Sequence, residues 1–168
     1  MASLINRLAG KLNLLRHEDL LYGRVNDIFI NLRFIKHIKN EHNANLIELL
    51  VQPKYDRVSM DVYVNKKEQI DIRELSDFLE LQYTDFSTTM PEYFSGRFLF
   101  SLYQRDTLNV KDEYVISFLN ALTEFLNQNG YYSGCLKCGG NDGITYSIYD
   151  RGKVTEICTP CLMKETKL

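Results

Sequence analysis

The most regular pattern of apolar residues along the chain lies between Val110 and Asn129. Apolar side chains recur there at intervals of three and four residues, namely Val115, Phe118, Leu119, Leu122, Phe125 and Leu126. This spacing places them on one face of an α-helix. Gly130 follows directly, and glycine is a common cap at the carboxyl end of a helix. The pattern therefore predicts an amphipathic helix over 110–129 whose apolar face is covered by other elements.

Alternation of apolar and polar residues, typical of half-buried strands, predicts strands over 57–64 and 97–104. An apolar run over 46–51 predicts another strand, joined to the strand at 57–64 by a turn at 52–56. Within 57–64 the even-numbered residues are all apolar and the odd-numbered residues are mostly polar. We therefore expect one face of that strand to contact water, as in many antiparallel sheets.

Three further segments complete the expected fold. Residues 3–21 predict one or two short amphipathic helices that end at Gly23, and residues 71–82 predict another helix. The apolar residues of 28–35 fit a strand or a helix, and their β-branched and aromatic content favours the strand. Together the patterns predict an α+β fold, with an antiparallel sheet of three to four strands and helices packed on one face.

Composition changes near residue 130. All nine phenylalanines precede it, whereas all four cysteines and six of the nine glycines lie at or after it. The first part can bury an aromatic core, but the second has too little apolar side-chain volume to fold by burial alone. We therefore predict two domains, an α+β domain over 1–130 that folds by itself and a small domain over 131–168 that depends on a metal.

The charges of the chain nearly balance. It has 20 lysines and arginines and 22 aspartates and glutamates, a net charge of −2, so it lacks the basic character of a dedicated nucleic-acid binder. No apolar run reaches the length of about 18 residues that a transmembrane helix needs. The first residues also lack the pattern of a secretion signal. These observations predict a cytoplasmic location.

The cysteines form two Cys-x-x-Cys pairs, Cys135 with Cys138 and Cys158 with Cys161, separated by 19 residues. This is the spacing of a four-cysteine zinc site rather than of a disulfide framework. Each two-residue gap lets one tight turn direct two sulfurs at an ion about 2.3 Å away. We therefore predict structural Zn²⁺ bound by all four cysteines. A redox-active pair is the alternative chemistry, which the presence of two pairs at this spacing disfavours.

Between the two pairs, residues 144–149 and 154–157 predict a β-hairpin that turns at 150–153. With Cys-Leu-Lys-Cys-Gly before it and Cys-Thr-Pro-Cys after it, the segment over about 133–163 resembles the zinc-ribbon family, in which such knuckles lie at the base of a hairpin. The sequence differs from common ribbons in having Pro160 and no glycine after the last cysteine. Because ribbons serve as folding staples, docking modules and nucleic-acid binders, the resemblance implies the four ligands and no particular function.

The sequence contains no recognisable catalytic centre. The histidines, His17, His37 and His42, have no metal-binding or catalytic partner at a suitable spacing. Nucleophile, phosphate-loop and dinucleotide motifs are absent from the sequence. We therefore expect no catalytic activity, and an active site assembled only by the fold is the remaining alternative.

These features predict a zinc-binding protein that acts through contacts with a protein partner, the ribbon serving as a structural staple or docking module. A nucleic-acid-binding or regulatory role is the alternative. It is supported by the ribbon and by the basic residues before residue 40, which are Arg7, Lys11, Arg16, Arg24, Arg33, Lys36 and Lys39. The net charge of −5 over 51–130 opposes phosphate contacts. A third alternative is that the whole chain is the soluble part of a longer protein that is tethered to a membrane.

Overall fold

The computed structural model describes residues 3–36, 55–81, 86–104, 110–140 and 144–166. Its helices are α1 (Leu4–Leu12), α3 (Ile72–Leu81), α4 (Asp112–Gln128) and α5 (Thr159–Thr166). Its strands are β1 (Leu15–His17), β2 (Leu20–Val25), β3 (Ile28–Lys36), β4 (Tyr55–Tyr63), β5 (Asn65–Lys66), β6 (Phe86–Thr88), β7 (Glu92–Phe94), β8 (Arg97–Gln104), β9 (Tyr131–Tyr132), β10 (Ile144–Asp150) and β11 (Lys153–Cys158). Helices and antiparallel strands together confirm the predicted α+β class. None of the described helices has the length and apolar character that a membrane span requires.

The main sheet is antiparallel and has seven strands. Six of them follow the order β1-β2-β3-β4-β8-β6, and β7 also pairs with β8. The expected count of three to four strands is therefore too low. The sequence did not reveal four of these strands, namely β1, β6 and β7, which have three residues each, and β2, which has six. The pairing that forms them is set by neighbouring strands rather than by their own alternation.

Most of the elements predicted from periodicity are confirmed. The predicted strands at 28–35, 57–64 and 97–104 are β3, β4 and β8, and the predicted helices at 71–82 and 110–129 are α3 and α4. Gly130 follows α4 with a φ of 80°, in the left-handed region that glycine favours. The predicted hairpin is β10–β11, which turns at Arg151 and Gly152 with φ angles of 51° and 79°. The strand predicted over 46–51 lies outside the described residues.

The prediction of helices throughout 3–21 is wrong beyond Leu12. Asn13 caps α1 with a φ of 54°, and the chain then enters β1 and β2, which pair with each other. Leucines at 14, 15, 20 and 21 fit a helical period. Instead, Leu15 of β1 pairs with β2, and Leu20 and Leu21 of β2 pair with β3. Gly23 lies inside β2, where a Cβ atom would come 2.9 Å from the Leu14 side chain. Glycine therefore permits a close approach at this position and does not end a helix.

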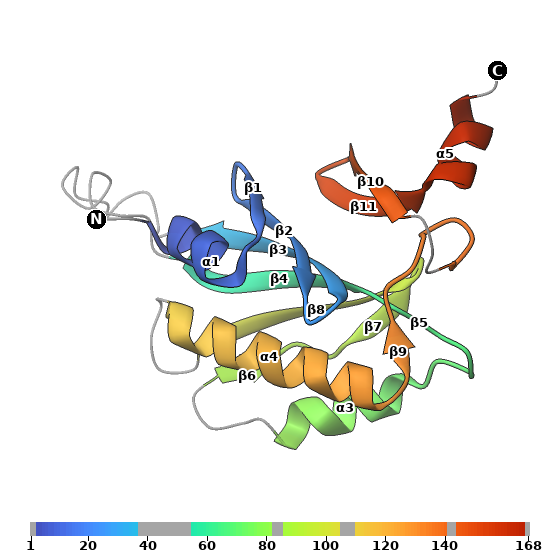
Figure 1. Cartoon of the computed structure of the whole chain (residues 1–168). Coiled ribbons are helices and arrows are strands. Elements are labelled where there is room, and N and C mark those ends of the chain that lie inside the picture. Colours follow the sequence, from blue (N-terminus) through green and yellow to red (C-terminus); the bar gives the residue numbers. More distant parts are fainter. Residues whose placement is uncertain (1–2, 37–54, 82–85, 105–109, 141–143, 167–168) are drawn as a thin grey trace.

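Helices and hairpin lie on opposite sides of the sheet, with α3 and α4 on one side and β10–β11 on the other (Figure 1). The core lies between the helices and the sheet and includes the fully buried side chains of Phe98, Phe118, Met60 and Leu32. Burying one large apolar side chain of this kind contributes about 1.5–3 kcal/mol. Helix α1 contributes Ile5 and Leu8 to the same core.

The second face of the sheet is partly covered by the hairpin. Val154 of β11 packs in one apolar cluster with Leu20, Phe29 and Tyr63, which belong to β2, β3 and β4. The expectation that this face of β4 contacts water is therefore wrong at Asp61 and Tyr63, which are both buried. The hairpin excludes water from that half of the strand, and only the tertiary structure determines where it lies.

Candidate metal centre

The first cysteine pair lies in a tight loop between β9 and β10. The amide of Cys135 donates to the carbonyl of Gly140 at 2.8 Å, and the amide of Gly139 donates to the carbonyl of Cys135 at 2.8 Å. Gly139 has a φ of 72°, which glycine adopts without steric cost. A Cβ atom at Gly134 would lie 2.6 Å from the carbonyl oxygen of Gly139, so this loop closes only around a glycine. The closed loop brings the Cys138 thiol beside that of Cys135.

The second cysteine pair lies where β11 ends and α5 begins. Cys158 is the last residue of β11, and Cys161 belongs to the first turn of α5. Pro160 also lies in this first turn, where its missing N–H has no partner within the helix to lose. The start of a helix, rather than a second glycine-ended knuckle, therefore positions Cys161. This arrangement explains both features in which the sequence differs from common ribbons.

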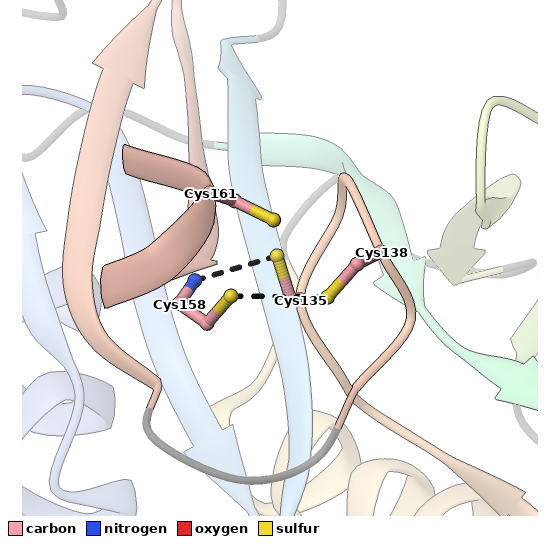
Figure 2. Close-up of side chains that lie close together, drawn as sticks. All are labelled: Cys135, Cys138, Cys158 and Cys161. Carbon is pink, nitrogen blue, oxygen red and sulfur yellow. Dashed lines mark hydrogen bonds between the residues drawn. The ribbon is translucent and has the colours of Figure 1, made fainter. Parts of the chain in front are cut away.

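All four cysteine side chains point toward a common centre (Figure 2), and their Sγ atoms lie within 4.8 Å of one another. The Sγ atoms of Cys138 and Cys158 are 3.7 Å apart. Sulfurs placed tetrahedrally at about 2.3 Å from a zinc ion are about 3.8 Å from each other. All four are free thiols. The four cysteines predicted from the sequence are therefore brought together and could hold a metal ion.

Backbone N–H groups surround the sulfur of Cys135. The amide of Cys158 donates to it at 3.3 Å, and the amides of Cys138 and Lys137 also act on it. Burial is the largest single influence and raises the pKa of this thiol, but the N–H donors together outweigh it and lower the pKa to about 6. In contrast, hydrogen bonding to the other thiols, that of Cys158 above all, raises the pKa of Cys161. Cys135 is therefore readily available as a thiolate, the form in which cysteine binds metals.

The site is enclosed on one side and open on the other. Cys135 and Cys158 are buried, Cys161 is partly buried and Cys138 is exposed. Ile157 and Leu162 pack around the buried sulfurs. With four protein ligands the site leaves no coordination position for a substrate, which is the arrangement of structural rather than catalytic zinc.

Polar side chains of the main sheet attach the hairpin to it. On β3, the Asn31 side chain donates to the carbonyl of Val154 at 2.7 Å and accepts from the amide of Val154 at 2.8 Å. On β2, Arg24 donates to the carboxylate of Glu156 from Nε at 3.0 Å and from Nη2 at 2.7 Å. The carbonyl of Glu156 accepts from the amide of Leu136 at 3.0 Å. The sheet, the hairpin and the first cysteine loop are thus connected in one network.

Ser133 fixes the chain just before the first cysteine. It is buried, accepts a hydrogen bond from the amide of Phe29 at 2.7 Å and donates one to the carbonyl of Tyr63. Arg24 also donates to the carbonyl of Ser133 at 3.3 Å. The Ser133 side chain therefore bonds to both β3 and β4 and fixes the point at which the cysteine loop leaves the sheet.

A buried carboxylate lies beneath the hairpin. Asp61 of β4 is 6% exposed, and the Nζ atom of Lys153 lies 2.7 Å from its Oδ2. Nε of Arg97 lies 3.5 Å from the same oxygen. Because an unpaired buried charge is costly, Lys153 of the hairpin and Asp61 of the sheet stabilise each other in the docked position.

The histidines, the other side chains considered for metal binding or catalysis, do not form a site among the described residues. His17 is exposed on β1, and its ring contacts that of Tyr149, with 4.6 Å between ring centroids. His37 and His42 lie outside the described residues. Among the described residues, the four cysteines are the one group of three or more His, Cys, Asp or Glu side chains close enough to hold an ion.

No protein-family model, curated protein or solved structure matches this chain. Its site is therefore interpreted from geometry. Sequence reasoning identified the candidate ligands but missed Asn31, Ser133 and Asp61, which position them. The signal that could have found Asn31 is a single amide among the apolar residues of β3, since buried polar groups need a partner.

Proposed function

We propose that this chain is a zinc-binding protein in which the ion has a structural role, and that it acts through contacts with another protein rather than by catalysis. The observation that carries the proposal is the convergence of four free thiols at the separation expected around tetrahedral zinc. Zinc and iron are the metals typical of tetrahedral sulfur sites. Of the two, zinc is redox-inert, so a closed set of four ligands around zinc supplies structure alone.

The ion would join three segments of the chain and add to the hydrogen bonds that already connect them. Cys135 and Cys138 come from the loop after β9, Cys158 from the end of β11 and Cys161 from α5. A two-stranded hairpin is marginally stable in water by itself. Metal binding therefore contributes directly to the folding of this region, as in small zinc domains.

Contacts made by the basic residues favour a protein partner over nucleic acid. Arg7 and Lys11 form ion pairs with Asp112, and Arg24 pairs with Glu156. These charges already have partners within the chain, so a phosphate backbone would have to compete for them. Large apolar side chains are exposed in the metal-bearing region instead, namely those of Leu136, Tyr149 and Met163. Exposed apolar side chains are more typical of protein contacts.

Metal analysis of protein purified without added zinc tests the proposal. We expect one zinc per chain by mass spectrometry of the metal, and colourless protein, because a four-cysteine iron site would absorb visible light. Cys158→Ser removes a buried ligand and should lower the zinc content well below one per chain. Ser147→Ala changes an exposed side chain of the same hairpin and should leave the zinc content unchanged.

Two outcomes contradict the proposal. Metal-free protein with two intact disulfides would show that the cysteines serve as covalent cross-links. Iron in place of zinc would show that the site has the wrong metal for a purely structural role.

A further inference from the structure

The four cysteines of the metal centre are unequally accessible to solvent. Cys138 is exposed, whereas Cys135 and Cys158 are buried and Cys161 is partly buried. Exposure determines which cysteine an oxidant in solution reaches first. Cys138 is therefore the sulfur of this centre that is most open to attack.

A pocket of about 280 Å³ lies beside the same cysteine, between the first cysteine loop and the main sheet. Of the four cysteines, Cys135 and Cys138 line this pocket, and Cys158 and Cys161 do not. The pocket has room for small solutes, since a water molecule occupies about 30 Å³ in the liquid. Because Cys135 is buried, a small oxidant in the pocket meets Cys138 first.

A second sulfur lies within reach of Cys138. The Sγ atoms of Cys138 and Cys158 are 3.7 Å apart (Figure 2), and this contact joins the two cysteine pairs rather than the members of one pair. A disulfide bond is about 2.0 Å long, so the two sulfurs need to approach by less than about 2 Å to form one. An exposed cysteine beside a second cysteine that can attack it is typical of redox-sensing sites.

We propose that the metal centre is also a peroxide-sensitive switch, in which Cys138 is oxidised first and then forms a disulfide with Cys158. The Cys138 thiolate attacks one oxygen of hydrogen peroxide, so that an S–O bond forms, the O–O bond breaks and hydroxide leaves. The Cys158 thiolate then displaces a second hydroxide from the resulting sulfenic acid and forms the S–S bond. The two sulfurs thus give two electrons to the peroxide, and both hydroxides pass to the solvent.

The disulfide removes two of the four proposed metal ligands. Cys135 and Cys161 alone are too few for a closed tetrahedral zinc site, so the ion is released. Leu136, which is 38% exposed, lies in the loop between the ligands of the first pair. The position of an apolar side chain that we assign to partner contacts therefore depends on the redox state. This inference rests on the proposed function, because it describes how the same site is regulated.

The test exposes the full chain, its zinc content measured beforehand, to a small excess of hydrogen peroxide. A zinc-sensitive dye follows release of the ion, and in a parallel sample dimedone, which reacts with sulfenic acids, marks the first oxidised sulfur. Free thiols are then alkylated, and the bonds are mapped by mass spectrometry of tryptic peptides. Cleavage after Lys137 separates the first two cysteines, and fragmentation distinguishes the last two. We expect dimedone on Cys138, loss of all bound zinc, a disulfide between Cys138 and Cys158, and alkylation of Cys135 and Cys161.

Gly140→Ala tests whether access to Cys138 controls the reaction. A Cβ atom at Gly140 would lie 3.3 Å from Sγ of Cys138, and the backbone there is not in the left-handed region. Once its zinc content is shown to match, this variant should release zinc severalfold more slowly, because the methyl group shields the sulfur. Gly10→Ala, on α1, is the matched control, since a Cβ atom there meets nothing within 4 Å. Should Gly140→Ala fail to hold zinc, the bonds mapped in the original chain decide.

Four outcomes overturn the inference. They are disulfides within the pairs, dimedone on a cysteine other than Cys138, zinc retained in the presence of peroxide, and equal rates of zinc release for Gly140→Ala and Gly10→Ala. Each of these leaves the proposed function intact, because the chain held zinc before it was oxidised. Absence of zinc before peroxide is added contradicts the proposed function itself, and the inference with it.

Discussion

Asn31 connects two parts of the chain with one side chain. Its carboxamide presents the same donor and acceptor as a peptide group, and it forms both hydrogen bonds with the backbone of Val154. It is 3% exposed, so water does not compete for these bonds. The side chain therefore attaches β11 to β3 at a point where no ladder of strand pairing joins them.

Replacing Asn31 should destabilise the protein and loosen the hairpin. Asn31→Ala leaves the buried N–H and C=O of Val154 without partners, which should lower the free energy of unfolding by about 2–4 kcal/mol. Urea denaturation of the zinc-loaded protein measures this change. Ser147→Ala, on the exposed side of the same hairpin, should change the free energy by less than about 0.5 kcal/mol. Equal effects of the two substitutions would show that the Asn31 contacts do not hold the hairpin.

Between elements, ion pairs join α1 to the start of α4. Asp112 lies in the first turn of α4, where a negative charge is favoured by the helix dipole. Its Oδ2 lies 2.9 Å from Nζ of Lys11 and 3.4 Å from Nε of Arg7. The hydrogen bond from Lys11, assisted by the charge of Arg7, lowers the pKa of Asp112 from its usual value of 3.8. These contacts orient α1 against the core helix.

Asp112→Asn should therefore lower stability in a pH-dependent manner. Because the pKa of Asp112 is lower in the folded chain, its contribution is fully present above pH 3.8 and is lost as the pH falls through the folded value. We expect a loss of about 0.5–1.5 kcal/mol at pH 7, which shrinks in strong acid. Urea denaturation at pH 7 and in strong acid measures this loss of stability. Glu113 is an exposed acid in the same turn, so Glu113→Gln is the matched control for the effect of the helix dipole alone. If Glu113→Gln lowered the free energy of unfolding as much as Asp112→Asn, the role of Lys11 and Arg7 would be contradicted.

For the whole molecule, the two regions of the chain are held by different forces. The helices and the sheet share a large apolar core to which α4 and Tyr131 belong. The hairpin meets the sheet through a small apolar cluster and through polar contacts, such as those between Arg24 and Glu156. Hydrophobic burial supports the first region, whereas the second depends on these contacts and on the proposed metal.

A strong chelator should therefore loosen only the end of the chain. Amide exchange with and without the chelator should show loss of protection over about 133–163 and unchanged protection over 110–129. The physical reason is that the proposed metal would supply the folding free energy of the cysteine region and not of the main core. Loss of protection across α4 would show instead that the hairpin and the main core fold as one unit.

Local pattern was enough to predict those features of the protein that depend on neighbouring residues. The periods of apolar residues determined α3, α4 and the central strands, because burial of one face is encoded within each segment. The spacing of the cysteines likewise indicated the candidate ligand set, since two residues between the members of a pair allow both sulfurs to face one ion.

Only the tertiary structure decided the features that depend on distant pairing. Leucines of 14–21 are compatible with a helix, and it is the neighbouring strand β3 that makes β2 a strand. Asp61 lies on the polar side of its strand, and it is buried because Lys153, far along the chain, docks above it. Contacts between residues so far apart follow from the packing of whole elements, which no local period encodes.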